Sequence, residues 1–260
     1  MSDESSNVLE DEGAGYLVSV SDIMAGLLFI FIITLMAFVL QLDESTQVFE
    51  KRTQTLQDRL DEIVNGLNIR AELLETLRNA LGERGVEVNI NEELGVLTLD
   101  ERAVGFESAE AEPTVSGRSN LLTVAHVLSD VLPCYSGDPS NETRCSAEHI
   151  GRLEAVFIEG HTDSRRLMGQ GARTNWNLSA DRAINSYRIM RDERPRLGAL
   201  VNSRKQPLFS VSGYAAQRPR ADLDIPSDDA RQRRIEMRFI MTPPERNPEV
   251  VEELQERGLR

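Results

Sequence analysis

The sequence predicts an α+β protein with a single N-terminal transmembrane helix, a helical linker and a mixed α/β domain. One run, 23–42, has no charged residue in 20 positions. Apolar residues then recur with heptad spacing, and after residue 85 strand-like alternation is interleaved with helical periods. We expect an acidic tail at 1–14, the transmembrane helix at 15–42, the linker at 43–84, the domain at 85–242 and a charged tail at 243–260.

The uncharged run is long enough to cross a bilayer, because a hydrocarbon core of about 30 Å requires about 20 helical residues. Only Thr34 and Gln41 interrupt its apolar character, so it lacks the polar stripe of a soluble core helix. A secretory signal is the main alternative. It requires a basic start and a small-residue cleavage site, whereas the preceding segment is acidic and no such site follows. We therefore expect one retained membrane span.

Asp22 is the one acidic residue of the longer apolar segment 16–42. A carboxylate at membrane depth is unfavourable, and it usually faces a protein partner or an ion path. The small polar neighbours Ser19 and Ser21 suit a close helix contact. The alternative is that Asp22 lies at the headgroup level and only ends the span. We favour the first interpretation.

The linker carries a heptad pattern that is typical of a coiled coil. Its apolar positions follow in steps of 4, 3, 4, 7, 3 and 4 residues: Leu56, Leu60, Ile63, Leu67, Leu74, Leu77 and Leu81. We expect two chains to pair along this seam in a homodimer. The alternative is a single amphipathic helix that packs on the following domain. Gly82 and Gly85 supply the stop signals for the helix.

The domain shows both strand and helix periods. We expect strands at 86–90, 95–99, 152–159, 208–211 and 234–241, with the last strand closing the sheet, and helices at 118–132 and 178–191. A short exposed helix at 250–257 would follow.

Cys134 and Cys145 are the two cysteines of the chain, with ten polar, turn-rich residues between them. A disulfide here would stabilise the fold by about 2–4 kcal/mol and would require an oxidising compartment such as the periplasm. A metal site with the nearby His126 and His149 is an alternative, although the spacing matches no common zinc pattern. Free thiols are the third possibility. If the disulfide forms, the domain lies outside the cytoplasm and the N-terminus inside.

Charge and composition exclude several functions. The formal net charge of −14 argues against a nucleic-acid partner, because phosphate binding requires a basic footprint. No nucleophile and base are paired in the sequence, and no metal-ligand spacing occurs, so we expect neither an enzyme nor a bound cofactor or metal. We expect His161 to hold a turn after a strand rather than to act as a catalytic base.

One segment resembles a known family. Residues 158–190 read IEGHTDSRRLMGQGARTNWNLSADRAINSYRIM. They are similar to the OmpA-like peptidoglycan-binding domain, whose signature is G-H-T-D, a variable loop and then N-x-x-L-S-x-x-R-A. The matching residues are Gly160, His161, Thr162, Asp163, Asn175, Leu178, Ser179, Arg182 and Ala183, followed later by Gly213-Tyr214 and Arg233-Arg234-Ile235-Glu236. The resemblance covers roughly 86–241.

This resemblance implies an α/β sandwich that binds the peptide stem of peptidoglycan. In the family, an Asp and an Arg hold the amino and carboxylate groups of diaminopimelate, and by match these are Asp163 and Arg182. Thr162 and Asn175 are the two further residues that we expect to bind peptidoglycan. A zwitterion requires one acceptor and one fixed donor fork, for which arginine is suited. The long, arginine-rich loop 164–174 and the long polar stretch 213–233 depart from the family pattern and could reshape the groove.

The N-terminal segment Y-L-V-S-V-S-D-I-M-A-G-L-L resembles the flagellar stator subunit MotB, in which one span also carries an early Asp. A span with an Asp, a helical linker and an OmpA-like domain is likewise the plan of ZorB, the B subunit of the Zorya anti-phage defence system. The acidic N-terminus, the cysteine loop and the lack of a Trp near Asp22 depart from flagellar MotB. We therefore favour a ZorB-like protein over a flagellar one.

The MotB-like resemblance implies the B subunit of an ion-driven stator in the bacterial inner membrane. Asp22 would carry the translocated ion, H+ or Na+. The implied partners are a second copy of the chain, five copies of a MotA- or ZorA-like multi-span subunit, peptidoglycan and membrane lipid. A flagellar-type stator subunit and a passive membrane-to-wall tether are the alternatives.

Overall fold

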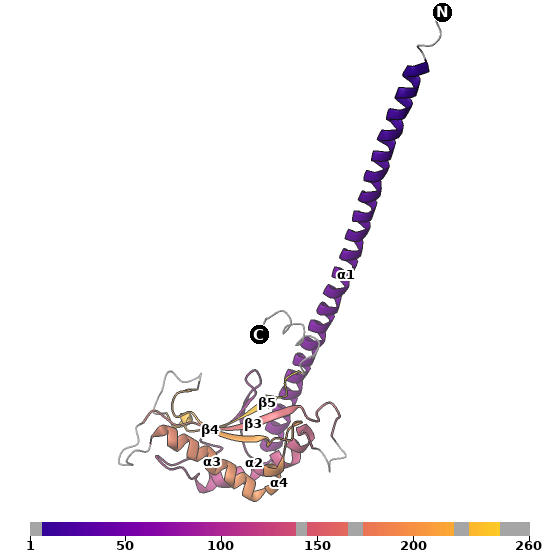
Figure 1. The fold of residues 1–260 in the computed structure, drawn as a ribbon. Coiled ribbons are helices and arrows are strands. Elements are labelled where there is room, and N and C mark those ends of the chain that lie inside the picture. Colours follow the sequence, from indigo (N-terminus) through magenta and orange to yellow (C-terminus); the bar gives the residue numbers. More distant parts are fainter. Residues whose placement is uncertain (1–6, 139–144, 166–173, 221–228, 245–260) are drawn as a thin grey trace, which may run out of the picture. The chain divides into compact units, whose positions relative to one another are not determined.

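The computed structural model describes residues 7–138, 145–165, 174–220 and 229–244, with side chains described from residue 20 onwards. The chain divides into two compact units, Met1–Leu60 and Asp61–Arg260, which we describe separately. The α+β class is confirmed: a long N-terminal helix is followed by a sheet with helices packed on it (Figure 1).

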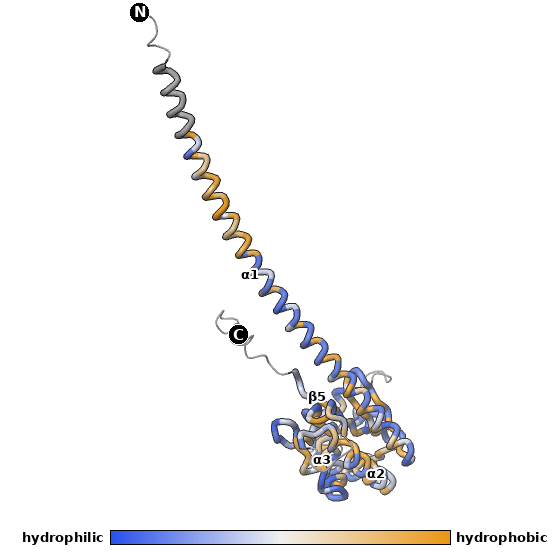
Figure 2. The backbone as a smooth tube through the Cα atoms, turned by 90° about the vertical axis from the view of Figure 1, so that its right-hand side faces the viewer, coloured by the Kyte–Doolittle hydropathy of each residue, from blue (hydrophilic) through white to orange (hydrophobic). Residues whose placement is uncertain are grey.

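Helix α1 (Asn7–Gly82) is 76 residues long and contains the apolar run. Figure 2 shows this run as an apolar band followed by a polar stretch. Within the described residues, α1 is the one helix that is long and apolar enough, by length and composition, to cross a membrane. The hydroxyl of Thr34 donates to the carbonyls of Ile30 and Phe31, both at 2.9 Å, so this polar group is satisfied inside the helix.

The last turns of α1 differ from the expected coiled-coil seam. Leu74, Leu77 and Leu81 are at most 1% exposed and belong to the hydrophobic core of the second unit. The earlier seam residues remain exposed: Leu56, Leu60, Ile63 and Leu67. The expectation of one seam from 56 to 81 is therefore corrected. The alternative, a helix packed on the following domain, holds for the last turns, whereas the apolar residues at 56–67 are exposed in this chain.

The sheet has five strands in the order β1-β2-β5-β3-β4. β3 and β4 are parallel, and the other neighbouring strands are antiparallel. Their bounds are β1 (Asn89–Asn91), β2 (Val96–Leu99), β3 (Leu153–Gly160), β4 (Phe209–Gly213) and β5 (Ile235–Met241). The expectation that the last strand closes the sheet is wrong. β5 lies between β2 and β3, because Ile235, Met237 and Phe239 fill the centre of the core.

Three helices lie on one side of the sheet (Figure 1): α2 (Val115–Val131), α3 (Asn175–Glu193) and α4 (Pro195–Ala199). The side chain of Thr114 accepts a hydrogen bond from the Gly117 amide and caps α2. Thr174 and Asn177 form a capping box at the start of α3. The 3-10 turns η1 (Leu132–Tyr135) and η2 (Ala230–Gln232) complete the described elements. The short helix expected at 250–257 lies outside the described residues.

Two glycines allow α3 to approach the sheet closely. Gly160 ends β3, and its register partner Gly213 ends β4. A Cβ on Gly160 would lie 1.9 Å from the Ser179 carbonyl oxygen, and one on Gly213 would lie 2.5 Å from the Ala180 amide nitrogen. Any side chain at either position would push away the first turns of α3, so these glycines set how closely that helix lies to the sheet.

The structure pairs Cys134 with Cys145 in a disulfide with Cα atoms 5.0 Å apart. Beside it, the ring of Tyr135 stacks on His149 with centroids 4.7 Å apart, and the imidazole Nε2 of His149 lies 3.3 Å from a carboxylate oxygen of Glu72 on α1. Burial, helped by the charge of Glu72, raises the pKa of Tyr135 to about 12. The segment around the disulfide is thus attached to the last turns of α1.

The two histidines named as possible metal ligands have other partners. His126 lies 2.9 Å from a carboxylate oxygen of Glu193 and also contacts Arg194, at the end of α3. The ring of His149 stacks on Tyr135, and its Nε2 lies beside the carboxylate of Glu72. The described contacts therefore give no support to a site that combines these histidines with the cysteines.

The core position of the last leucines leads to a stability prediction. Leu74→Ala removes a fully buried side chain and should lower the free energy of unfolding of the domain by about 2–5 kcal/mol. Leu60→Ala removes the same side chain from an exposed position of the same heptad pattern, so it should change domain stability little. Chemical unfolding of the full-length chain in detergent, followed by the fluorescence of Trp176, measures both. A loss of stability for Leu74→Ala as small as that for Leu60→Ala would show that the last turns of α1 are not part of the domain core.

Candidate functional site

The G-H-T-D residues lie where β3 leaves the sheet. The His161 amide donates to the Arg234 carbonyl at 3.0 Å, and the Thr162 amide donates to the Ala215 carbonyl at 2.9 Å. The Ala215 amide in turn donates to the hydroxyl of Ser179 on α3 at 3.0 Å. The loop after β3 is thereby fixed between the segment after β4, the start of β5 and the first turns of α3.

Asp163 is a buried carboxylate that pairs with two arginines. One of its carboxylate oxygens lies 2.7 Å from Nη2 of Arg165 and 3.0 Å from Nη1 of Arg233. Burial alone would raise the pKa of Asp163, but the hydrogen bonds and charges of these two arginines outweigh it and hold the pKa below its usual value. Arg233 also pairs with Glu101, so it joins the loop after β2 to Asp163. Asp163 is therefore ionised at neutral pH.

Two further predicted residues lie beside Asp163. The side-chain amide of Asn175 donates to the carbonyls of Asp163 at 3.2 Å and Arg165 at 2.9 Å, which ties the loop to the start of α3. The hydroxyl of Thr162 is buried and makes no hydrogen bond within the described part of the chain. A buried hydroxyl without a partner is unfavourable, so this group is available to a ligand or to water.

Arg182 has a different environment from the one that the resemblance implies. Its side chain is buried, and its Nε and Nη2 donate to the carbonyls of Glu110 at 2.9 Å and Glu107 at 3.0 Å. Its guanidinium carbon lies 4.7 Å from the ring centroid of Phe106. The structure thus joins Thr162, Asp163 and Asn175 in one cluster, whereas Arg182 lies under the loop that follows β2.

Sequence reasoning missed the loop residues that contact this site, and it gave Arg233 no role. Arg233 was part of the matched R-R-I-E motif, so the signal for it was present. The contacts of Glu101 and Phe106 with the site had no signal, because these residues lie about 130 and about 75 positions away from their partners Arg233 and Arg182.

A second cluster lies on β3 and β5, where Glu159, His161 and Glu236 place potential metal-ligand atoms within 4.8 Å of one another. Both carboxylate oxygens of Glu159 are bonded by Arg238, at 3.0 and 2.8 Å. Arg234 holds Glu236 at 2.6 Å. The guanidiniums of Arg218, Arg234 and Arg238 already neutralise the two carboxylates, and a divalent cation would add two positive charges. We therefore assign this cluster a structural role.

His161 is the centre of that cluster and is fully buried. Its ring stacks on Tyr214, and its Nε2 lies 3.4 Å from Glu236. Burial lowers the pKa of His161 below 6.5; Glu236 opposes this shift, and Arg234 adds to it. Burial would raise the pKa of Glu236, but the neighbouring imidazole of His161 and the charge of Arg234 lower it to about 2. His161 is therefore neutral at neutral pH, and its role in holding the turn stays a prediction.

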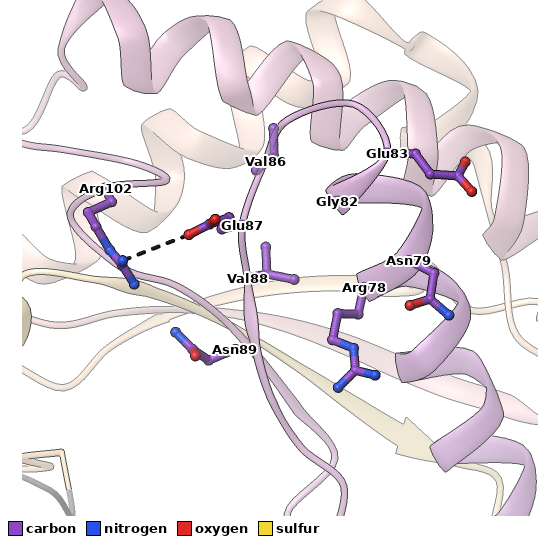
Figure 3. Close-up of a pocket in the computed structure, with 9 residues that line it drawn as sticks. All are labelled: Arg78, Asn79, Gly82, Glu83, Val86, Glu87, Val88, Asn89 and Arg102. Carbon is purple, nitrogen blue, oxygen red and sulfur yellow. Dashed lines mark ion pairs between the residues drawn. The ribbon is translucent and has the colours of Figure 1, made fainter.

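A hollow of about 640 Å³ lies away from these residues, between the end of α1 and the segment that enters β1 (Figure 3). Arg78, Glu83, Glu87 and Arg102 give it side chains of both charges, and Arg102 pairs with Glu87 at 3.8 Å. None of the functional-site residues predicted from the sequence lines it.

Asp22 lies on α1 and is exposed along with the neighbouring residues of the apolar run. It forms no hydrogen bond or ion pair with any other residue that the structure describes. If its carboxylate has a partner in the membrane, that partner comes from outside the described part of this chain.

No protein-family model matches the chain. Over 173 residues it is 25% identical to Motility protein B of Bacillus subtilis (strain 168), a match that covers 66% of this chain and 55% of that protein. The chain therefore matches only about half the length of this relative.

Two solved structures show a distant likeness. A MotB-like protein from Desulfovibrio vulgaris has a TM-score of 0.46 at 18% identity, covering 68% of this chain and 96% of that one. The periplasmic domain of Helicobacter pylori MotB has a TM-score of 0.41 at 14% identity, covering 64% and 86%. At these values the likeness carries no argument about function.

The buried His161 gives a pH prediction. Because its pKa is lowered by folding, the unfolded chain takes up a proton below about pH 6.5 that the folded chain does not, so stability falls as the pH falls through this range. Glu236 adds a further loss between pH 4.5 and about 2. His161→Gln should weaken the dependence between pH 7.5 and 5.5. Thermal unfolding of the wild type and the variant across this pH range measures this, and equal slopes for both would contradict the assignment.

Proposed function

We propose that this chain is the B subunit of an ion-driven membrane stator that is anchored to peptidoglycan. The observation that carries the proposal is Asp22, one acidic residue inside an apolar segment and without a partner in the described chain. One charge that crosses 100 mV releases about 2.3 kcal/mol, roughly four times the thermal energy RT. A carboxylate at this depth can bind and release H+ or Na+ as a neighbouring subunit moves past it. The similarity to Motility protein B supports this assignment.

The wall-binding part of the proposal rests on the loop after β3. Asp163 supplies a carboxylate for the amino group of a diaminopimelate stem, and the buried hydroxyl of Thr162 supplies a further polar contact. Asn175 positions the loop, and Arg182 is the proposed partner of the stem carboxylate. The disulfide supports a periplasmic location for the domain and hence a cytoplasmic N-terminus in the inner membrane. The proposed role is anchoring and ion-driven motion, not enzymatic catalysis.

The proposed assembly contains two copies of the chain and five copies of a multi-span A subunit. The exposed residues at 56–67 supply the contact between the two copies, since the later leucines are already buried in each domain. The A subunits would surround the paired spans, with lipid outside them.

A Zorya-like defence role is our preferred context, because the acidic N-terminus and the cysteine loop depart from the flagellar pattern. The similarity to a motility protein is equally consistent with a flagellar-type stator. The neighbouring genes distinguish these two contexts. A passive membrane-to-wall tether accounts for the span and the domain, but it leaves Asp22 without a role.

Asp22→Asn tests the motor. Asparagine is nearly isosteric but cannot bind and release a proton, so the variant should assemble in the membrane while ion flux and biological function are lost. Asp43→Asn changes an acidic residue just beyond the apolar run and should retain both. Membrane fractionation measures assembly, and a pH-sensitive dye in proteoliposomes with the A subunit measures flux. Normal function of a normally assembled Asp22→Asn protein would leave only the tether.

Asp163→Asn tests the wall anchor. Loss of the charge should weaken sedimentation of the full-length chain with purified cell walls by roughly tenfold or more, as expected for a charge-assisted hydrogen bond. Asp100→Asn is the matched control. Asp100 is similarly buried and also pairs with the arginine two positions later, Arg102 at 3.2 Å. If both variants sediment like the wild type, peptidoglycan binding at Asp163 is refuted.

A further inference from the structure

The loop that covers Arg182 consists of residues 106–113, and we call it the strap. Its two ends are bonded to each other, and its middle is exposed. Phe106 and Pro113 form an isolated antiparallel bridge, and just outside them the Thr114 amide donates to the Gly105 carbonyl at 2.9 Å. Phe106 is buried in the core, whereas Glu107 and Glu110 are exposed. The strap is therefore anchored to the domain at its base, whereas its middle is exposed.

The contact between the strap and Arg182 has the geometry of a carboxylate pair. Nε and Nη2 form one edge of the guanidinium, and this edge normally takes the two oxygens of a carboxylate in a bidentate pair. Here the same two groups donate to the carbonyl oxygens of Glu110 and Glu107. The strap thus presents two acceptors in the place of the two oxygens of a carboxylate.

A second side chain of α3 holds the strap, one turn further on. The amide nitrogen of Asn185 lies 3.2 Å from the carbonyl oxygen of Ala111 and 2.9 Å from a carboxylate oxygen of Glu112. The strap also contains Ala109 at φ +66°, a left-handed conformation that residues with a Cβ rarely adopt. A strained loop with an exposed middle requires such bonds to remain in place.

We propose that the strap is an internal competitor for the ligand carboxylate at Arg182, so that the site binds the peptide stem fully only when the strap lifts. This inference rests on the proposed function, because the ligand is the carboxylate of a peptidoglycan stem. In the closed state, Arg182 is 1% exposed and cannot reach that carboxylate. The exposed carboxylates of Glu107, Glu110 and Glu112 would also repel it. When the strap lifts, the stem carboxylate replaces two neutral acceptors with a charged bidentate one.

Asn185→Ala tests the strap without changing Asp163 or Arg182. Fewer bonds hold the strap, so the open population should rise and the stem peptide should bind about three- to tenfold more tightly. The control is Asn120→Ala, which also removes an amide that donates to a loop carbonyl, that of Ala103 at 2.8 Å, but lies outside the strap. The full-length chain in detergent is titrated with the tripeptide L-Ala-γ-D-Glu-meso-diaminopimelate by calorimetry.

A second measurement requires no ligand. Phenylglyoxal modifies accessible guanidinium groups, and peptide mass spectrometry gives its rate at Arg182. We expect faster modification in Asn185→Ala than in the wild type or Asn120→Ala. Unchanged reactivity would overturn the strap proposal. Where the wild type binds the tripeptide, faster modification with unchanged or weaker binding would also overturn it, because the strap would then belong to the ligand surface. Faster modification in a chain that binds no tripeptide at all would support the strap and instead refute the proposed ligand.

Discussion

The site depends on the close approach of α3 to the ends of β3 and β4, which is possible because Gly160 and Gly213 have no side chain. At this distance the hydroxyl of Ser179 can accept a hydrogen bond from the Ala215 amide. The side-chain amide of Asn175 can likewise donate to the backbone of the loop that carries Asp163. The G-H-T-D motif and the helix that follows it therefore act as one unit. The glycine of the motif allows the helix to lie close to the sheet, and the polar residues of the motif and the helix form hydrogen bonds at that distance.

Charge in this region is arranged as fixed pairs between elements that are far apart in the sequence. Arg233 joins Asp163 to the loop after β2, and Arg238 joins β5 to Glu159 on β3. Because each carboxylate is matched by a guanidinium, the network can be buried without a net charge. The same matching makes it unsuitable for a metal ion. The arginines near the proposed ligand therefore have partners within the protein, and a ligand must compete with them.

The elements that depend on local patterns could be predicted from the sequence. The apolar run, the two long domain helices and the five strands follow from periodicity, and the G-H-T-D motif located the cluster around Asp163. The central place of β5 could not be predicted, because strand order depends on contacts between distant segments. The burial of Leu74, Leu77 and Leu81 was ambiguous for a different reason. The same heptad spacing suits a second helix or the sheet of the same chain, and only the fold decides between them.

The strap over Arg182 shows what a motif match cannot predict. The motif identifies the arginine, but its environment is set by a loop more than 70 positions earlier that the motif does not include. A residue match therefore establishes which chemical group is present. It does not establish whether that group is accessible in the state that the structure describes.

The buried leucines at the end of α1 also have a mechanical consequence. A pull that reaches Asp61 along the helix is taken up by Leu73, Leu74, Leu77 and Leu81, which interlock with the core of the domain. Such an interface is loaded in shear over several residues at once, whereas a flexible tether would stretch before it transmitted any load. Tension on the helix is therefore passed directly to the sheet that carries the loop of Asp163.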